Sequence, residues 1–113
     1  MQPKKKQRKW LSSSHEYSPR QEKDLAKRLG GRVTRGSGSG NDKGDVAVRG
    51  KYRIECKCTK NKSYSLKREI IEKIEEEALN CGETPIMNIH FINEFGKKLN
   101  GVYVIPEEFL DID

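Results

Sequence analysis

Apolar residues at helical spacing predict a first helix near the N-terminus. Leu25, Ala26 and Leu29 recur at the intervals typical of one buried helix face. Ser18-Pro19 supplies an N-cap followed by a residue suited to the first turn, and Gly30-Gly31 supplies an end. The pattern therefore predicts a helix from about residue 18 to residue 29.

The same helix carries a carboxylate where the stripe predicts burial. Glu22 stands one turn before Leu25 and two turns before Leu29, on the apolar face. Burying a carboxylate costs free energy unless a partner compensates it. A glutamate in a first turn is also favoured by the helix dipole and can point into water. Taken alone, Glu22 is best explained as such a solvent-facing residue.

Residues 43–60 alternate in the manner of a β-hairpin with a turn near 49–51. A turn with an odd number of residues, or a bulge, would place Asp45 on the same face as Glu55 and Lys57, whereas an even turn would place it opposite Cys56. We expect an odd turn; one over residues 50–52 with a bulge, for example, would place Asp45 opposite Lys57. One face of the second strand then carries Tyr52, Ile54, Cys56 and Cys58, and the other carries Arg53, Glu55 and Lys57.

The remaining segments predict a mixed α/β domain. A short strand over 32–35 precedes a Gly/Ser loop over 36–44, and a second helix is expected over 66–80. Two more strands over 85–92 and 101–105 and a helical turn over 106–110 complete the order α-β-β-β-α-β-β-α, with a central sheet. The expected buried face of the second helix comprises Leu66, Ile70, Ile71, Ile74, Ala78 and Leu79.

Composition narrows the class of protein. The 113 residues suffice for one domain, and only 33% are hydrophobic against 35% charged, so we expect a thin core and stabilisation by dimerisation. A net charge of +6 favours a polyanionic partner such as nucleic acid. We expect an intracellular protein without a membrane span, because no long apolar run or secretory signal is present and the three cysteines suggest reduced thiols. Residues 1–16 are expected to form a flexible basic arm, either an ordinary solvated tail or a DNA contact.

The charged face of the hairpin suggests a metal site. Two carboxylates close together, from Asp45 and Glu55, repel each other unless a cation lies between them, and oxygen ligands suit Mg²⁺ or Mn²⁺. The backbone carbonyl of Cys56 could add a ligand, and Lys57 would lie beside the metal site to assist a water molecule. Glu22 would supply a fourth group, which would explain a carboxylate on a buried stripe.

These residues also carry a resemblance. Gly44-Asp45 followed by Ile54-Glu55-Cys56-Lys57 resembles the PD-(D/E)XK nuclease signature, with Gly44 where that family has proline. The wider pattern over residues 18–92 is similar to the archaeal-type Holliday junction resolvases and their phage relatives. The resemblance implies a small α/β, restriction-endonuclease-like domain over 17–113, with a central mixed sheet flanked by helices. It further implies a Mg²⁺-dependent endonuclease that cuts four-way DNA junctions as a homodimer.

The resemblance also implies roles for individual residues. Glu22, Asp45 and Glu55 would hold the metal ion, directly or through water, and Lys57 would be the catalytic lysine. Ser37 or Ser39, in the Gly/Ser loop, would assist catalysis, with Ser37 preferred. The implied DNA contacts are Arg35, Ser39, Lys43, Lys60, Lys62, Tyr64 and Lys67.

Other interpretations remain open at this point. A lone Glu-x-Lys on a strand is often a surface ion pair. The protein could be a general or repair nuclease acting on flaps or duplexes, or a DNA-binding protein of the same fold that does not cut. A zinc module is a further alternative, with its ligands drawn from Cys56, Cys58, Cys81 and His90.

Overall fold

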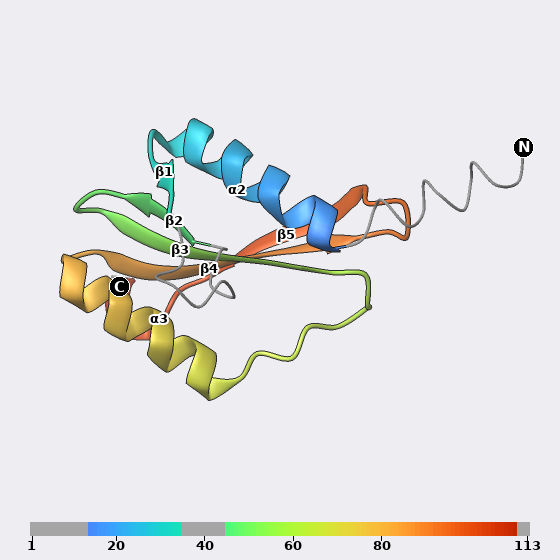
Figure 1. Cartoon of the computed structure of the whole chain (residues 1–113). Coiled ribbons are helices and arrows are strands. Elements are labelled where there is room, and N and C mark those ends of the chain that lie inside the picture. Colours follow the sequence, from blue (N-terminus) through green and yellow to red (C-terminus); the bar gives the residue numbers. More distant parts are fainter. Residues whose placement is uncertain (1–13, 35–44, 111–113) are drawn as a thin grey trace, which may run out of the picture.

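The computed structural model describes residues 14–34 and 45–110; for residues 14–16 and 45 only the backbone is described. Within these described residues, five strands form one mixed sheet, with one helix on each face (Figure 1). The chain order confirms the predicted α/β class. The elements are α2 (Ser14–Leu29), β1 (Arg32–Val33), β2 (Asp45–Val48), β3 (Tyr52–Thr59), α3 (Arg68–Cys81), β4 (Thr84–Ile92), β5 (Lys98–Val104) and the 3-10 turn η1 (Glu107–Phe109).

The strands lie in the order β1-β2-β3-β4-β5. All neighbours are antiparallel except β3 and β4, which are parallel because α3 connects them as a crossover helix. Helices α2 and α3 cover opposite faces of the sheet (Figure 1). No helix among residues 14–34 and 45–110 is both long and apolar enough to cross a membrane.

Helix α2 begins earlier than the sequence predicts. It starts at Ser14 rather than near residue 18, so Pro19 lies inside it and removes one backbone donor. Tyr17 is buried and forms a 2.8 Å hydrogen bond with His90, and this tertiary contact anchors the turn before the proline. The backbone of residues 14–16, which was expected to belong to the N-terminal arm, is therefore helical. The predicted end is confirmed, because Gly30 follows Leu29 with φ of +72°.

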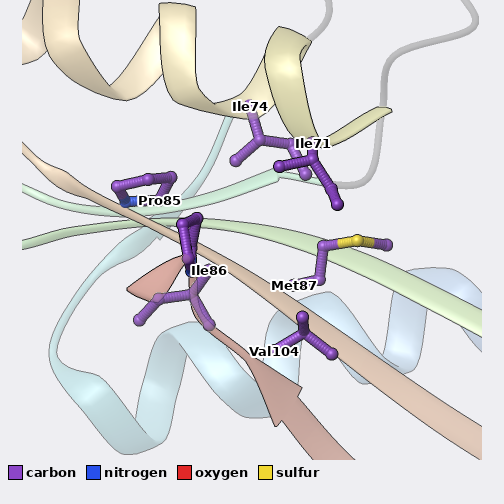
Figure 2. Close-up of a pocket in the computed structure, with 7 residues that line it drawn as sticks. Ile71, Ile74, Pro85, Ile86, Met87 and Val104 are labelled. Carbon is purple, nitrogen blue, oxygen red and sulfur yellow. The ribbon is translucent and has the colours of Figure 1, made fainter. Parts of the chain in front are cut away.

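The hydrophobic core is divided between the two faces of the sheet. Under α2, a cluster joins the helix to the three central strands, and it comprises Leu25, Ala26, Val46, Ile54, Cys56 and Ile86. Under α3, Ile74 packs with Met87 and Ile89 of β4. A small cavity of about 40 Å³ remains between α3 and the sheet (Figure 2). Its walls are Ile71, Ile74, Pro85, Ile86, Met87, Val104 and Pro106.

Helix α3 buries a narrower stripe than the sequence predicts. Ile74 and Ala78 are buried, but Leu79 is 64% exposed and Leu66 precedes the helix and is exposed, so the prediction was wrong for these two leucines. Successive residues turn by about 100° around a helix axis. Ala78 faces the sheet, and the next residue, Leu79, is turned away from it toward solvent. The predicted C-terminal end of the helix, at residue 80, is close to the observed end at Cys81. Gly82 follows in the left-handed conformation at φ of 67°.

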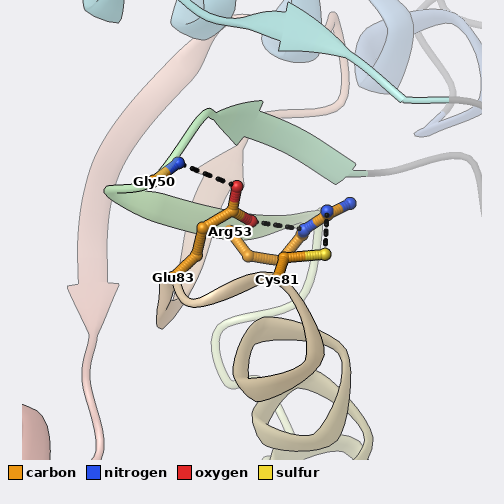
Figure 3. A network of polar contacts seen from close by, with 4 residues as sticks. All are labelled: Gly50, Arg53, Cys81 and Glu83. Carbon is orange, nitrogen blue, oxygen red and sulfur yellow. Dashed lines mark hydrogen bonds and ion pairs between the residues drawn. The ribbon is translucent and has the colours of Figure 1, made fainter.

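A polar network fixes the hairpin turn to the start of β4 (Figure 3). Glu83, just before β4, accepts hydrogen bonds from the Gly50 N–H at 3.2 Å and from Arg53 Nε at 3.1 Å. The Arg53 guanidinium also lies 3.1 Å from Cys81 Sγ. Burial alone would lower the pKa of Arg53, but the charges and hydrogen bonds of Glu83 and Cys81 raise it overall. This network holds β2–β3 against the end of α3.

The last two strands form a hairpin whose second strand begins earlier than predicted. Strand β5 starts at Lys98, where the sequence predicted a start near residue 101. The Asn93 side-chain oxygen accepts the backbone N–H groups of Phe95 and Lys97, and Gly96 has φ of +79°. These features close a tight turn, so pairing resumes immediately after it.

Candidate functional site

The register of the β2–β3 hairpin brings position 45 opposite Glu55. Val48 pairs with Tyr52, which leaves a three-residue turn over 49–51, and Asp45 pairs with Glu55. The predicted odd turn is confirmed at residues 49–51, whereas the exemplified turn over 50–52, which would pair Asp45 with Lys57, was wrong. The turn closes at 49–51 because the Lys51 N–H bonds the Val48 carbonyl at 2.8 Å and Gly50 accepts φ of +74°. Positions 45, 55 and 57 therefore belong to one face of the sheet.

Glu55 and Lys57 form an ion pair on that face. Lys57 Nζ lies 3.2 Å from Glu55 Oε2. The Glu55 residue is only 5% exposed, and its strand neighbour Met87 belongs to the core under α3. Lys57 keeps a side chain 38% exposed, so the ammonium faces solvent while it compensates the carboxylate. The pair thus combines a buried acidic oxygen with an accessible cation.

Tyr64 lies beside this pair. It belongs to the segment between β3 and α3, is half-buried, and packs against the core under α3. Burial raises the pKa of its hydroxyl, while the charge of Lys57 lowers it and that of Glu55 raises it. The resemblance implied a DNA contact for Tyr64, and the structure gives it a packing role next to the charged pair. The other implied contacts in this segment, Lys60, Lys62 and Lys67, are exposed.

Glu22 reaches the sheet from the α2 side. It is 6% exposed, so the apolar stripe predicted its burial correctly and the solvent-facing interpretation was wrong. Burial raises the pKa of the Cys58 thiol; a hydrogen bond with Ser18 lowers it, and the charge of Glu22 raises it again. Cys58 belongs to the face of β3 opposite to Glu55. Among the described residues, the pairing of β2 with β3 ends at Glu55. Positions 56–59 of β3 therefore have no described strand beside them on the β2 side, and there the two faces of the sheet meet at an edge.

Gln21 is a site residue that the sequence did not single out. Its amide nitrogen lies 3.2 Å from the Lys57 carbonyl oxygen and 3.2 Å and 3.0 Å from the main-chain and side-chain oxygens of Asn88. Gln21 is buried and stands one turn before Leu25 on the stripe that carries Glu22. A second polar residue on an apolar helix face was the available signal.

The donor set suits a hard divalent cation. Asp45 and Glu55 are acidic residues at directly paired strand positions, and carboxylate oxygens are ligands that match Mg²⁺. The part of the chain whose side chains are described contains no group of three His, Cys, Asp or Glu residues that could hold a metal ion. The Asp45 side chain lies outside that part, as do Arg35, Ser37, Ser39 and Lys43.

The alternative zinc ligands do not come together. Cys58 and His90 are neighbours in the β3–β4 pairing, on the face under α2. Cys81 ends α3, where its sulfur contacts Arg53 on the other side of the sheet. The interpretation as a zinc module is therefore not supported by the geometry.

Comparison of the chain with protein-family models, curated proteins and solved structures found no match. No relative therefore assigns a role to Glu22, Asp45, Glu55 or Lys57. Their roles must be derived from position, charge and burial alone.

Proposed function

We propose that this protein is a Mg²⁺-dependent DNA endonuclease with a restriction-endonuclease-like domain, of the PD-(D/E)XK kind. The observation that carries the proposal is the buried Glu55 carboxylate, paired with Lys57 at 3.2 Å and with Asp45 directly opposite in the hairpin. A surface ion pair would leave the carboxylate in water, but Glu55 is buried. A buried acidic oxygen next to a partly accessible cation on the same strand face is an arrangement that a metal-dependent reaction site could use.

Asp45 and Glu55 are the proposed metal ligands, with the Cys56 carbonyl and Glu22 as further oxygen donors. When bound, Mg²⁺ supplies positive charge that stabilises a phosphate in its transition state, and Mn²⁺ takes the same ligands. Glu22 would approach from the α2 side, past the edge of β3 at positions 56–59.

Lys57 is the proposed positioning and proton-transfer group for hydrolysis. Water oxygen forms the new bond to phosphorus and releases a proton to solvent, the P–O bond to the leaving oxygen breaks, and that oxygen takes up a proton that the Lys57 ammonium donates and solvent then replaces. The exposed ammonium of Lys57 can hydrogen-bond the attacking water or a phosphate oxygen. Ser37 would assist from the Gly/Ser loop, as the resemblance implies.

DNA would run from the reaction site along the exposed cations between β3 and α3. Lys60, Lys62 and Lys67 are exposed and follow directly after the strand of Lys57. Arg35, Ser39 and Lys43 would contact further phosphates, as the resemblance implies. Contacts of this kind read charge and shape rather than sequence.

The preferred substrate is a four-way junction cut symmetrically by a homodimer. Self-association would cover apolar side chains that the domain leaves accessible on the β4–β5 hairpin, namely Phe95, Leu99, Val102 and Tyr103. Sedimentation velocity should detect a dimer at micromolar concentration. A strictly monomeric protein would contradict paired cutting, while leaving single-strand cleavage possible.

The catalytic test uses two matched ion pairs. Glu55→Gln and Lys57→Met should each lower Mg²⁺-dependent cleavage of a synthetic four-way junction by about 100-fold or more. Glu72→Gln and Arg68→Met alter an exposed pair of similar length, 3.0 Å, and should leave the rate unchanged. Asp45→Asn should match the loss seen with Glu55→Gln.

The cleavage products discriminate between the nuclease interpretations. Symmetric paired nicks near the branch support a junction resolvase, whereas scattered cuts in linear arms indicate a general or repair nuclease. If wild-type protein binds DNA without cutting it in Mg²⁺ or Mn²⁺, the chain is a non-catalytic DNA-binding protein and the proposal fails.

A further inference from the structure

A second charged surface lies on the sheet face opposite to the Glu55–Lys57 pair. A groove runs between α2 and the β4–β5 hairpin, with Asn88 and His90 on its floor. Four cationic residues and one acidic residue line it. We call this surface the α2 groove; its charged residues are Arg20, Asp24, Lys27, Arg28 and Lys98.

Two of the four cations are held in place. The Arg20 guanidinium carbon lies 5.4 Å from the centre of the Tyr17 ring, within the range of a cation–π contact. Arg28 Nη2 lies 3.5 Å from the Tyr103 hydroxyl. Held cations lose less side-chain entropy on binding an anion than free ones do. Within residues 17–34 and 46–110, neither arginine is within ion-pair distance of a carboxylate.

The pKa of His90, on the floor of the groove, is affected by the positive charges around it. Burial lowers the pKa of His90, and the charges of Lys98 and Arg28 lower it further. Asp24 is the only acidic residue in the described lining of the groove, so it offsets one of the four cations. The net charge of the α2 groove is therefore positive, which matches a polyanion.

We propose that the α2 groove binds the phosphate backbone of a second DNA segment, separate from the segment that is cut. This inference rests on the proposed function for the identity of the polyanion. Because α2 and the Glu55–Lys57 pair occupy opposite faces of the sheet, one straight duplex cannot lie along both. A branched DNA offers an additional arm, and the groove would hold that arm by backbone contacts.

The test compares two double variants of equal charge. Lys27→Gln/Lys98→Gln removes two groove cations that have no structural contact to Tyr17 or Tyr103. Arg49→Gln/Lys51→Gln removes two exposed cations at the hairpin turn. Binding of each protein to a four-way junction and to a short linear duplex is measured by fluorescence anisotropy in EDTA over a range of salt concentrations. Circular dichroism verifies folding.

The groove variant should bind the junction about tenfold more weakly, and its slope of log K against log salt should fall by about 0.9 for each lost phosphate contact. Its affinity for linear duplex should change little, and the turn variant should resemble the wild type. Equal losses for junction and duplex, or equal losses in both variants, would overturn the proposal. The proposal would also be overturned if the groove variant lost binding to phosphatidylserine vesicles while its binding to DNA stayed intact.

These measurements contain no divalent metal ion, so they are independent of cleavage. A protein that never cuts DNA but shows the junction-specific loss in the groove variant would refute the proposed activity and support the groove. If the wild-type protein cuts junctions but the groove variant binds them with unaltered affinity, the proposed activity is supported and the proposed role of the groove is refuted.

Discussion

Gln21 is hydrogen-bonded to the backbone of Lys57 from the opposite face of the sheet. The Gln21 amide nitrogen, on α2, lies 3.2 Å from the Lys57 carbonyl oxygen, while the Lys57 side chain pairs with Glu55 under the other face. The same amide nitrogen contacts both oxygens of Asn88 on β4. One buried side chain therefore fixes α2 against β3 and β4 at the residue proposed to act on the phosphate.

Removing this amide should weaken both the fold and the reaction. Gln21→Met keeps the length of the side chain but leaves the Asn88 side-chain oxygen without its donor, at a cost of about 1–3 kcal/mol in the free energy of unfolding. Misplacement of Lys57 should lower kcat by about tenfold to 100-fold without changing DNA affinity. Urea unfolding and single-turnover cleavage measure the two effects. Lys23→Met, on the exposed face of α2, is the control, and equal effects in both variants would contradict a positioning role.

The ion pair between Arg53 and Glu83 should contribute strongly to stability. Its side chains are 14% and 5% exposed, and removal of one partner leaves the other charge largely buried. We expect Arg53→Met to lower the free energy of unfolding by about 3 kcal/mol. The exposed pair of Arg68 and Glu72 serves as the control, and Arg68→Met should leave stability unchanged. A small effect of Arg53→Met in urea unfolding would show that the network in Figure 3 is dispensable.

Stability should depend on pH through His90. Burial and the cations Lys98 and Arg28 lower its native pKa from the ordinary 6.5, so the unfolded chain binds more protons at mildly acidic pH. The contribution of His90 is therefore complete above pH 6.5 and is lost as the pH falls through the lower native pKa. Urea unfolding at neutral and mildly acidic pH should show a smaller decline for His90→Gln than for wild type. His15→Gln, at the only other histidine, should retain the full decline; identical slopes in all three proteins would refute the assignment.

Substitution of two apolar residues of α3 should affect stability very differently, although the sequence predicts both to be buried. Ile74 is 3% exposed and packs against Met87, so Ile74→Ala should cost about 2–5 kcal/mol through lost contacts and an enlarged cavity in Figure 2. Leu79 is largely exposed, and Leu79→Ala should leave monomer stability nearly unchanged. Thermal unfolding of both variants measures the difference. A large loss for Leu79→Ala would instead indicate that a partner covers this residue.

Local signals predicted the elements of this fold well. The glycine after α2, the turn before β3 and the alternation along β3 each act within a few residues, so the sequence reveals them directly. The position of Glu22 in an apolar period was visible in the same way, but the local pattern alone favoured a solvent-facing side chain, whereas Glu22 is buried. The pairing of Glu55 with Lys57 follows from their positions on one strand face.

Contacts between distant segments were not predictable from local pattern. The start of α2 depends on the contact of Tyr17 with His90, 73 residues away in sequence. The exposure of Leu79 depends on how narrow the contact between α3 and the sheet is. The location of Tyr64 depends on its packing against the core under α3. The α2 groove likewise joins cations from α2 with one from β5, so no single segment indicates it.

The turn between Val48 and Tyr52 also restricts how the hairpin can evolve. Because successive strand residues alternate in direction, inserting or deleting one residue there would exchange the two sides of β3 relative to Asp45 if the turn kept its three residues. Changes by two residues preserve the parity that keeps both acidic positions together. Length variants of this hairpin that keep an odd turn and the reaction site should therefore differ by even steps.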